Sequence, residues 1–115
     1  MDTQEKVTTC GKYAEEKKAK HVVIMELTGL TDITDYFIIA SGTSERHVKT
    51  IAEHIETSMK KLGIKPYSIE GYHEGRWVIL DYQNVIVHVF LESLRELYDL
   101  ESLWIEAKTY RFEDI

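Results

Sequence analysis

Residues 70–104 read EGYHEGRWVILDYQNVIVHVFLESLRELYDLESLW. Two apolar runs in this segment, 77–82 and 85–91, are separated by Gln83 and Asn84, which predicts a β-hairpin with a tight turn. The second run passes directly into helical spacing that is rich in Leu, Tyr, Trp and Arg among carboxylates. This composition is more typical of a recognition surface than of a reaction centre.

The residues before the hairpin predict the rest of a sheet and its helices. Helical spacing covers 3–18, and β-branched apolar runs predict strands at 22–27 and 34–41. A second helix is expected from its N-cap Ser44 to its C-cap Gly63, followed by a strand at 65–70. The crossover through this helix predicts that the strands at 34–41 and 65–70 run parallel. We therefore expect an α/β (α+β) fold, with a mixed sheet of about five strands and helices packed on it.

The region after residue 91 is expected to form two short helices rather than one. Its apolar residues fall on two stripes that are out of phase, one with Leu94, Leu97 and Tyr98 and one with Leu100, Leu103, Trp104 and Ala107. Asp99 is a candidate cap between them. The tail after Lys108 is predicted to be variable or mobile.

Length and composition limit the function. The 115 residues predict a single domain over 1–115, and the net charge of −6 argues against direct recognition of nucleic acid as the main task. From Glu92 onward, seven carboxylates face three bases, which is compatible with a basic protein partner. A single cysteine, no membrane-length apolar run and no transit segment predict a cytoplasmic protein, with a bacterial origin favoured. A homodimer through an apolar face stays open.

The sequence contains one candidate for a ligand-binding or catalytic site. The turn SGTS, from Ser41 to Ser44, precedes a helix and could cradle an anion as in nucleotidyltransferases, although a capped loop is the favoured interpretation. The following strand offers only Glu70, whereas magnesium needs a pair of carboxylates. Asp32 and Asp35 lie before the turn. We predict no catalytic residue, no metal site and no cofactor; the alternative is a nucleotide-binding enzyme that uses this turn.

Two polar residues lie on apolar strand faces of the hairpin. Alternation places His88 with Ile86 and Phe90, and Asp81 with Trp77 and Ile79, so Asp81 and His88 are expected to pair across the hairpin. A structural role is favoured over catalysis because no nucleophile motif accompanies them. The same third of the chain holds Arg76, Trp77, Arg95, Tyr98 and Trp104, residue types that anchor interfaces, which favours a docking face.

The order of these motifs resembles that of the ribosomal silencing factors, also called the Iojap family. The resemblance covers roughly residues 4–108 and rests on DITDYFIIASG at 32–42, Ser44, RHV at 46–48, EG at 70–71, WV at 77–78, LDY at 80–82, VHVF at 87–90, Arg95, Tyr98, LE at 100–101 and LW at 103–104. One departure is the hairpin turn, where the family often has a glycine beside an acidic residue.

The resemblance implies a nucleotidyltransferase-like fold without the catalytic carboxylates and a translational repressor that catalyses nothing. It implies binding to the large ribosomal subunit through ribosomal protein L-fourteen, which sterically blocks joining of the small subunit. By motif, the expected partner-binding residues are Trp77, Arg95, Leu97, Tyr98, Leu100 and Glu101, supported by Asp81, His88 and Trp104.

Overall fold

The hairpin forms as predicted in the computed structural model, which describes residues 1–114. Strand β4 (Trp77–Asp81) runs antiparallel to β5 (Val85–Leu91), with Ile79 opposite His88. Gln83 takes a left-handed backbone conformation with φ 72°, a conformation that two-residue hairpin turns require and glycine or asparagine adopts most easily. The Asp81 carboxylate accepts a hydrogen bond from the Gln83 backbone N–H at 2.7 Å. This contact stabilises the turn without a glycine.

The sheet is mixed and has six strands, one more than the sequence predicts. Its order is β3 (Ser68–Glu70), β4, β5, β2 (Tyr36–Gly42), β1 (Lys20–Glu26) and β6 (Lys108–Arg111). Among the strand pairs within residues 1–114, only β2 and β5 run parallel. Strand β3 runs in the same direction as β2, as the crossover predicted, but β4 and β5 lie between them. Strand β5 takes the central place because six of its seven residues are buried, so both of its faces need cover.

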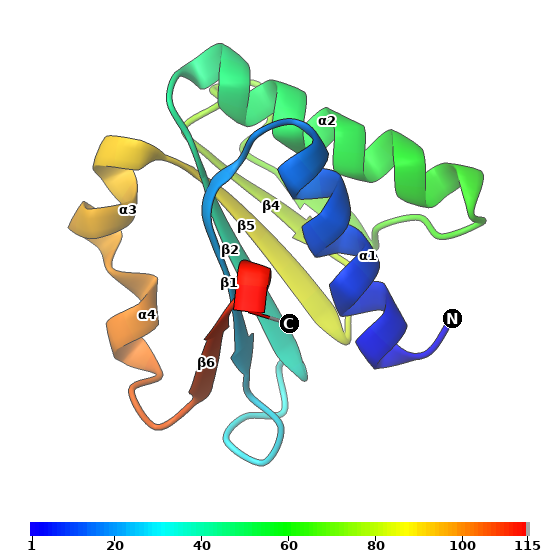
Figure 1. Cartoon of the computed structure of the whole chain (residues 1–115), viewed down its shortest axis with the longest axis vertical. Coiled ribbons are helices and arrows are strands. Elements are labelled where there is room, and N and C mark those ends of the chain that lie inside the picture. Colours follow the sequence, from blue (N-terminus) through cyan, green and yellow to red (C-terminus); the bar gives the residue numbers. More distant parts are fainter. Residues whose placement is uncertain (115) are drawn as a thin grey trace.

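Helices α1 (Thr3–Glu16) and α2 (Glu45–Lys61) cover one face of the sheet (Figure 1). The α2 residues Val48, Ile51, Ala52, Ile55 and Met59 form its buried stripe, as the spacing predicted. Ser44 caps this helix by accepting a hydrogen bond from the His47 backbone N–H at 3.0 Å, and Asp2 caps α1 through a capping box with Glu5. These two helices and the facing strand residues form the larger core.

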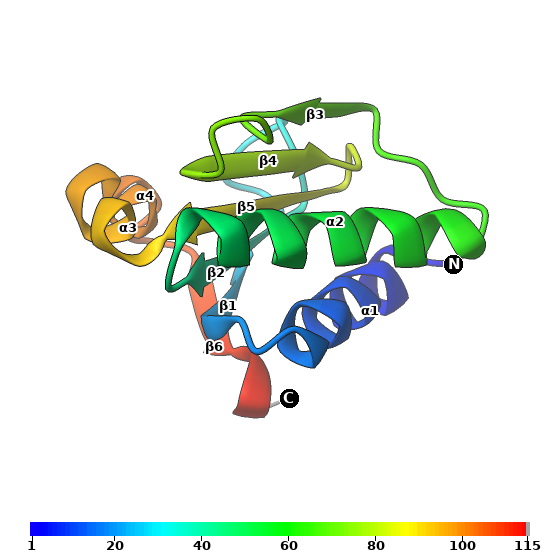
Figure 2. The ribbon, with the colours of Figure 1, turned by 90° about the horizontal axis from the view of Figure 1, so that it is seen from above.

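The opposite face has a smaller core under α3 (Glu92–Tyr98) and α4 (Leu100–Leu103). Seen from above, α3 and α4 lie apart from α1 and α2 (Figure 2). The chain breaks at Asp99, as predicted, but Asp99 does not cap α4 through a side-chain bond to the backbone. Its backbone is left-handed, with φ 45° and ψ 52°, and this conformation ends α3. Neither short helix contains a buried residue.

The prediction of a mobile tail is wrong for the described residues. Strand β6 pairs antiparallel with β1, and the short helix η1 (Phe112–Asp114) follows it. The Phe112 ring packs against the larger core beside Gly11 of α1. Gly11, which weakens the helix by its backbone freedom, is buried there, and a Cβ at this position would collide with the Phe112 ring. Because Gly11 has no side chain, it leaves the space that the Phe112 ring occupies.

This contact reverses the usual effect of a glycine substitution in a helix. An alanine in place of glycine normally stabilises a helix by about 1 kcal/mol, but overpacking a filled site costs about 1–3 kcal/mol. We expect Gly11→Ala to lower the free energy of unfolding, measured by chemical denaturation. In a Phe112→Ala background the same substitution should raise it. A stabilised single variant would contradict the packing described here.

Candidate functional site

Aromatic side chains gather on the face of the sheet that α3 and α4 cover. Trp77 of β4 stacks on Phe90, its neighbour across the hairpin, with ring centroids 4.8 Å apart. The Tyr98 ring, at the end of α3, lies 5.0 Å from the Trp77 ring. Phe37 contacts His88 edge-on at 4.6 Å and lies 6.4 Å from Trp104. These rings form a continuous base under the α3–α4 segment, residues 92–107.

His88 belongs to this aromatic cluster and does not pair with Asp81. Asp81 lies opposite Ile86 and binds the turn, so the predicted pair does not form. Instead the Trp77 indole N–H donates a hydrogen bond to His88 Nδ1 at 3.1 Å, which places the imidazole proton on Nε2. Within the described residues Nε2 has no hydrogen-bond partner, and His88 is only 5% exposed. Burial lowers the pKa of His88 from 6.5 to about 4, so the ring is neutral near neutral pH.

Arg95 points inward from α3 rather than toward solvent. Its Nη1 donates to the His21 carbonyl oxygen at 2.6 Å and to Ser41 Oγ at 2.9 Å. Its Nε and Nη2 each lie 3.2 Å from a carboxylate oxygen of Glu101 at the start of α4. Because the Arg95 side chain is only 11% exposed, it acts mainly as a clamp that holds α3, α4 and the sheet together.

The outer surface of the α3–α4 segment is apolar and acidic. Its exposed apolar side chains are between 53% and 86% accessible: Leu97, Tyr98, Leu103 and Ile105. Glu92, Glu96 and Asp99 are exposed on the same segment, and these three line a cavity of about 690 Å³ together with the Arg95 clamp. Single exposed apolar residues are ordinary, but four within nine positions form a patch that suits a partner.

The predicted contact residues divide into two groups. Leu97 and Tyr98 are exposed, whereas Trp77 is half-buried beneath Tyr98. Leu100 and Trp104 pack on the smaller core, and Arg95 and Glu101 bind each other. Ile105 and Leu30 line a small cavity of about 230 Å³ with Leu103, although neither residue was predicted as a contact. No local pattern marks Leu30, because it lies in a loop far from this segment in sequence.

The turn at 41–44 offers few free donors to an anion. The Ser44 hydroxyl caps α2, and the Thr43 backbone N–H donates to His47 Nδ1 at 2.9 Å. Ser41 is buried and accepts from Arg95. Asp35 lies at the opposite end of β2, about 20 Å from Ser41 at the usual rise of a strand. The turn and this carboxylate are therefore not assembled into one site.

Residues 1–114 show neither a metal-binding cluster nor a membrane-spanning helix. No group of three or more His, Cys, Asp or Glu side chains in this range is placed to hold a metal ion. No helix in the same range is long and apolar enough to cross a bilayer.

The fold and the exposed α3–α4 segment define an α+β interaction domain, and the comparisons give its family. Residues 1–115 match the model of the family described as "Ribosomal silencing factor during starvation". The chain belongs to this family, as the resemblance predicted, and is a ribosome-associated regulator of translation.

Similar proteins are found in bacteria and in organelles. The chain is 36% identical to the ribosomal silencing factor RsfS of Halalkalibacterium halodurans, over 100% of this chain and 98% of that protein. It is 33% identical to the mouse (Mus musculus) protein named "Mitochondrial assembly of ribosomal large subunit protein 1", over 77% of this chain and 40% of that protein. The crystal structure of a protein from Chromobacterium violaceum matches with a TM-score of 0.88 and 34% identity, covering 90% of this chain and 87% of that one.

The burial of His88 predicts a loss of stability in acid. The unfolded chain takes up a proton near pH 6.5, but the folded chain does so only near pH 4, because burial disfavours the charged ring. Stability from this group is therefore complete above pH 6.5 and is lost as the pH falls toward 4, by about 3 kcal/mol in total. Across this range the unfolding free energy of the wild type should fall by that amount relative to that of the His88→Leu variant, which has no titrating group at this position. A difference between the two unfolding free energies that does not change with pH would contradict a neutral, buried His88.

The cap at Ser44 predicts a purely structural effect of its substitution. Ser44→Ala should destabilise the protein by about 1 kcal/mol, because the His47 backbone N–H loses its acceptor. Thermal unfolding measures this change. The same scans with ATP and Mg²⁺ test the nucleotide-binding alternative: we expect no shift in the melting temperature of the wild type, and a shift abolished by Ser44→Ala would support a nucleotide site.

Proposed function

We propose that this protein represses translation by binding the large ribosomal subunit through ribosomal protein L-fourteen and blocking the small subunit from joining. It acts by occupying a surface and catalyses no reaction. We also place it in the cytoplasm, since its one cysteine, Cys10, is a free buried thiol suited to a reducing compartment.

The observation that carries this proposal is the exposed apolar surface of the α3–α4 segment on its aromatic base. Leu97 is 73% exposed and Tyr98 is 53% exposed, although both are large apolar side chains next to each other. Tyr98 rests on Trp77, so its position is set before any partner arrives. Anchors that are already ordered lose little conformational entropy on binding, which favours affinity.

The charge of the same segment supports a basic partner. Glu92, Glu96 and Asp99 are exposed on the same segment as the apolar residues. Ribosomal proteins are commonly basic, and opposite charges at the rim of an interface speed association and fix orientation. The name of the mouse relative associates that protein with the large ribosomal subunit. Family membership and surface chemistry therefore favour the large subunit as the target.

The size of the domain is sufficient for steric blocking. The chain measures 35 × 34 × 26 Å along its principal axes. Two surfaces in direct contact approach within about 4 Å, so a folded body of this size on a joining surface keeps the second subunit away. No reaction is needed for this effect, and the separation of Asp35 from the turn at 41–44 argues against the nucleotidyltransferase alternative.

Co-sedimentation with purified ribosomal particles tests this function. We expect the wild type to pellet with free large subunits, but not with small subunits or joined ribosomes, and to prevent added small subunits from joining. Leu97→Ala and Tyr98→Ala should weaken binding at least about 10-fold, because central apolar anchors dominate interface energies.

The matched control is Tyr67→Ala, which removes a 77% exposed tyrosine just before β3, at the other edge of the sheet. It should bind and block like the wild type. Binding of all three folded variants at wild-type strength would move the contact away from the α3–α4 segment. A wild type that ignores large subunits would overturn the proposed function itself.

A further inference from the structure

The loop at residues 17–21, which joins α1 to β1 and includes the first two residues of β1, is held at both ends by side chains from other elements. At its start, the Lys17 carbonyl oxygen lies 2.8 Å from His47 Nε2 of α2. His47 Nδ1 accepts from the Thr43 backbone, so Nε2 carries the proton and donates to Lys17. At its end, Arg95 of α3 donates to the His21 carbonyl oxygen at 2.6 Å. The loop is thus held between α2 and the α3–α4 segment.

Two residues of this loop have backbone conformations that favour glycine. Lys18 has φ 61° and His21 has φ 51°. A side chain in this left-handed region carries a conformational cost that glycine avoids. At Lys18 this conformation ends α1, with the Lys18 N–H donating to the Glu15 carbonyl oxygen at 2.9 Å and the Ala19 N–H to the Ala14 carbonyl oxygen at 3.1 Å. Lys18 is exposed and, within residues 1–114, forms no ion pair.

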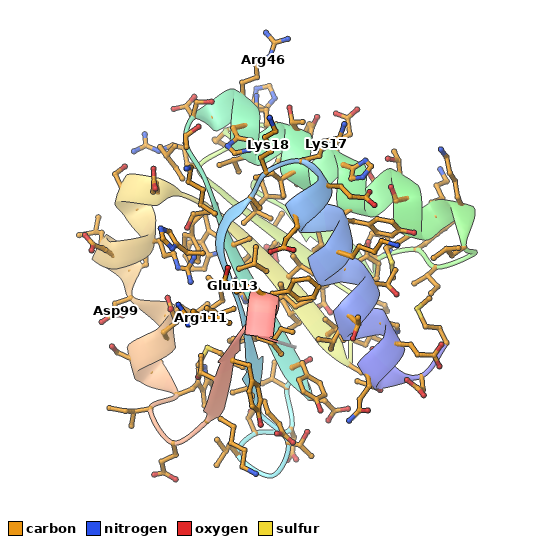
Figure 3. All side chains as sticks on the ribbon, viewed as in Figure 1. Lys17, Lys18, Arg46, Asp99, Arg111 and Glu113 are labelled. Atoms are coloured by element: carbon orange, nitrogen blue, oxygen red, sulfur yellow. The ribbon has the colours of Figure 1, made fainter. Side chains whose placement is uncertain are left out.

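Lys18 lies in a basic corner, which we define as Lys17, Lys18 and Arg46. All three are exposed and lie at one end of the molecule, where α1 ends and α2 begins (Figure 3). In the described part of the chain none of them has a carboxylate partner within 4 Å. Of the acids that adjoin the corner in sequence, Glu16 is bound to His54 at 2.8 Å, whereas Glu15 and Glu45 are exposed. Three exposed cations without an ion pair in residues 1–114 can therefore turn to an anionic partner.

We propose that the basic corner contacts phosphate groups of ribosomal RNA beside the protein that the α3–α4 segment binds. The inference rests on the proposed docking to the large subunit. It departs from the expectation that nucleic acid is not recognised directly, because that expectation considered only the total charge. Lysine and arginine on a fixed loop neutralise phosphates without reading sequence, and such contacts position a protein. Arg95 joins this loop to α3 through its hydrogen bond to the His21 carbonyl oxygen, so the two contact regions are linked within one fold.

The test measures the affinity for large subunits at several salt concentrations. The variant combines Lys17→Gln, Lys18→Gly and Arg46→Gln. Glycine at position 18 removes a charge and adopts the left-handed backbone conformation without steric cost, so we expect the fold to be kept. We expect at least about a 10-fold loss of affinity at low salt, and a slope of log affinity against log salt that is shallower by about 2 to 3.

A matched control removes three exposed lysines elsewhere, Lys60, Lys61 and Lys65, by substitution with Gln. It lowers the total charge equally and should keep the wild-type slope. The basic-corner variant should also bind isolated ribosomal protein L-fourteen as tightly as the wild type, since only the RNA contact is lost.

The outcomes separate this inference from the proposed function. If the wild type binds large subunits but the basic-corner variant keeps the wild-type slope, the RNA contact is overturned and the docking stands. If the basic-corner variant and the control change the slope equally, the effect arises from total charge alone, and the RNA contact is again overturned. Weaker binding of the variant to isolated L-fourteen would assign the corner to a protein contact instead. A wild type that binds no large subunits would overturn the proposed function.

Discussion

The Arg95 guanidinium connects three parts of the chain that are far apart in sequence. It binds the His21 carbonyl, the buried Ser41 hydroxyl and the Glu101 carboxylate, while only 11% of its side chain is exposed. A guanidinium that is removed from water must have its donors satisfied, so this cluster tolerates little rearrangement. Since α3 and α4 contain no buried residue, packing alone would hold them weakly. Their position over the sheet depends on this cation together with the packing of the half-buried Leu100 and Trp104 on the smaller core.

The aromatic base supplies the other half of the arrangement. Trp77 is fixed by stacking on Phe90 and by its hydrogen bond to His88. The Tyr98 ring, at the end of α3, lies 5.0 Å from the Trp77 ring and 6.4 Å from the Phe90 ring. Asp99, with its left-handed backbone, then changes the direction of the chain. After this change Leu103 is exposed, whereas Trp104 packs on the smaller core. A surface ordered in this way binds with less entropic cost than a flexible helix pair would.

Local patterns predicted the elements well, because each depends on neighbours in sequence. The hairpin, the amphipathic stripe of α2, the Ser44 cap and the break at Asp99 all follow from spacing or capping within a few residues. Two predictions that depended on a contact with another part of the chain were wrong. Asp81 does not pair with His88 because the hairpin register sets it opposite Ile86. The tail is ordered because Phe112 meets Gly11, about 100 positions earlier in the chain.

The sequence by itself determined the α+β class, the order of helices and strands as far as α4, and the family, since these depend on periodicity, capping and ordered motifs. Only the tertiary structure decided which way the functional side chains point. Arg95 and Glu101 lie inward, Leu97 and Tyr98 lie outward, and Lys17 and Arg46 meet at one corner. The physical reason is that a side chain's partner is chosen by the register and packing of strands distant in sequence, and no local propensity records which distant groups will meet.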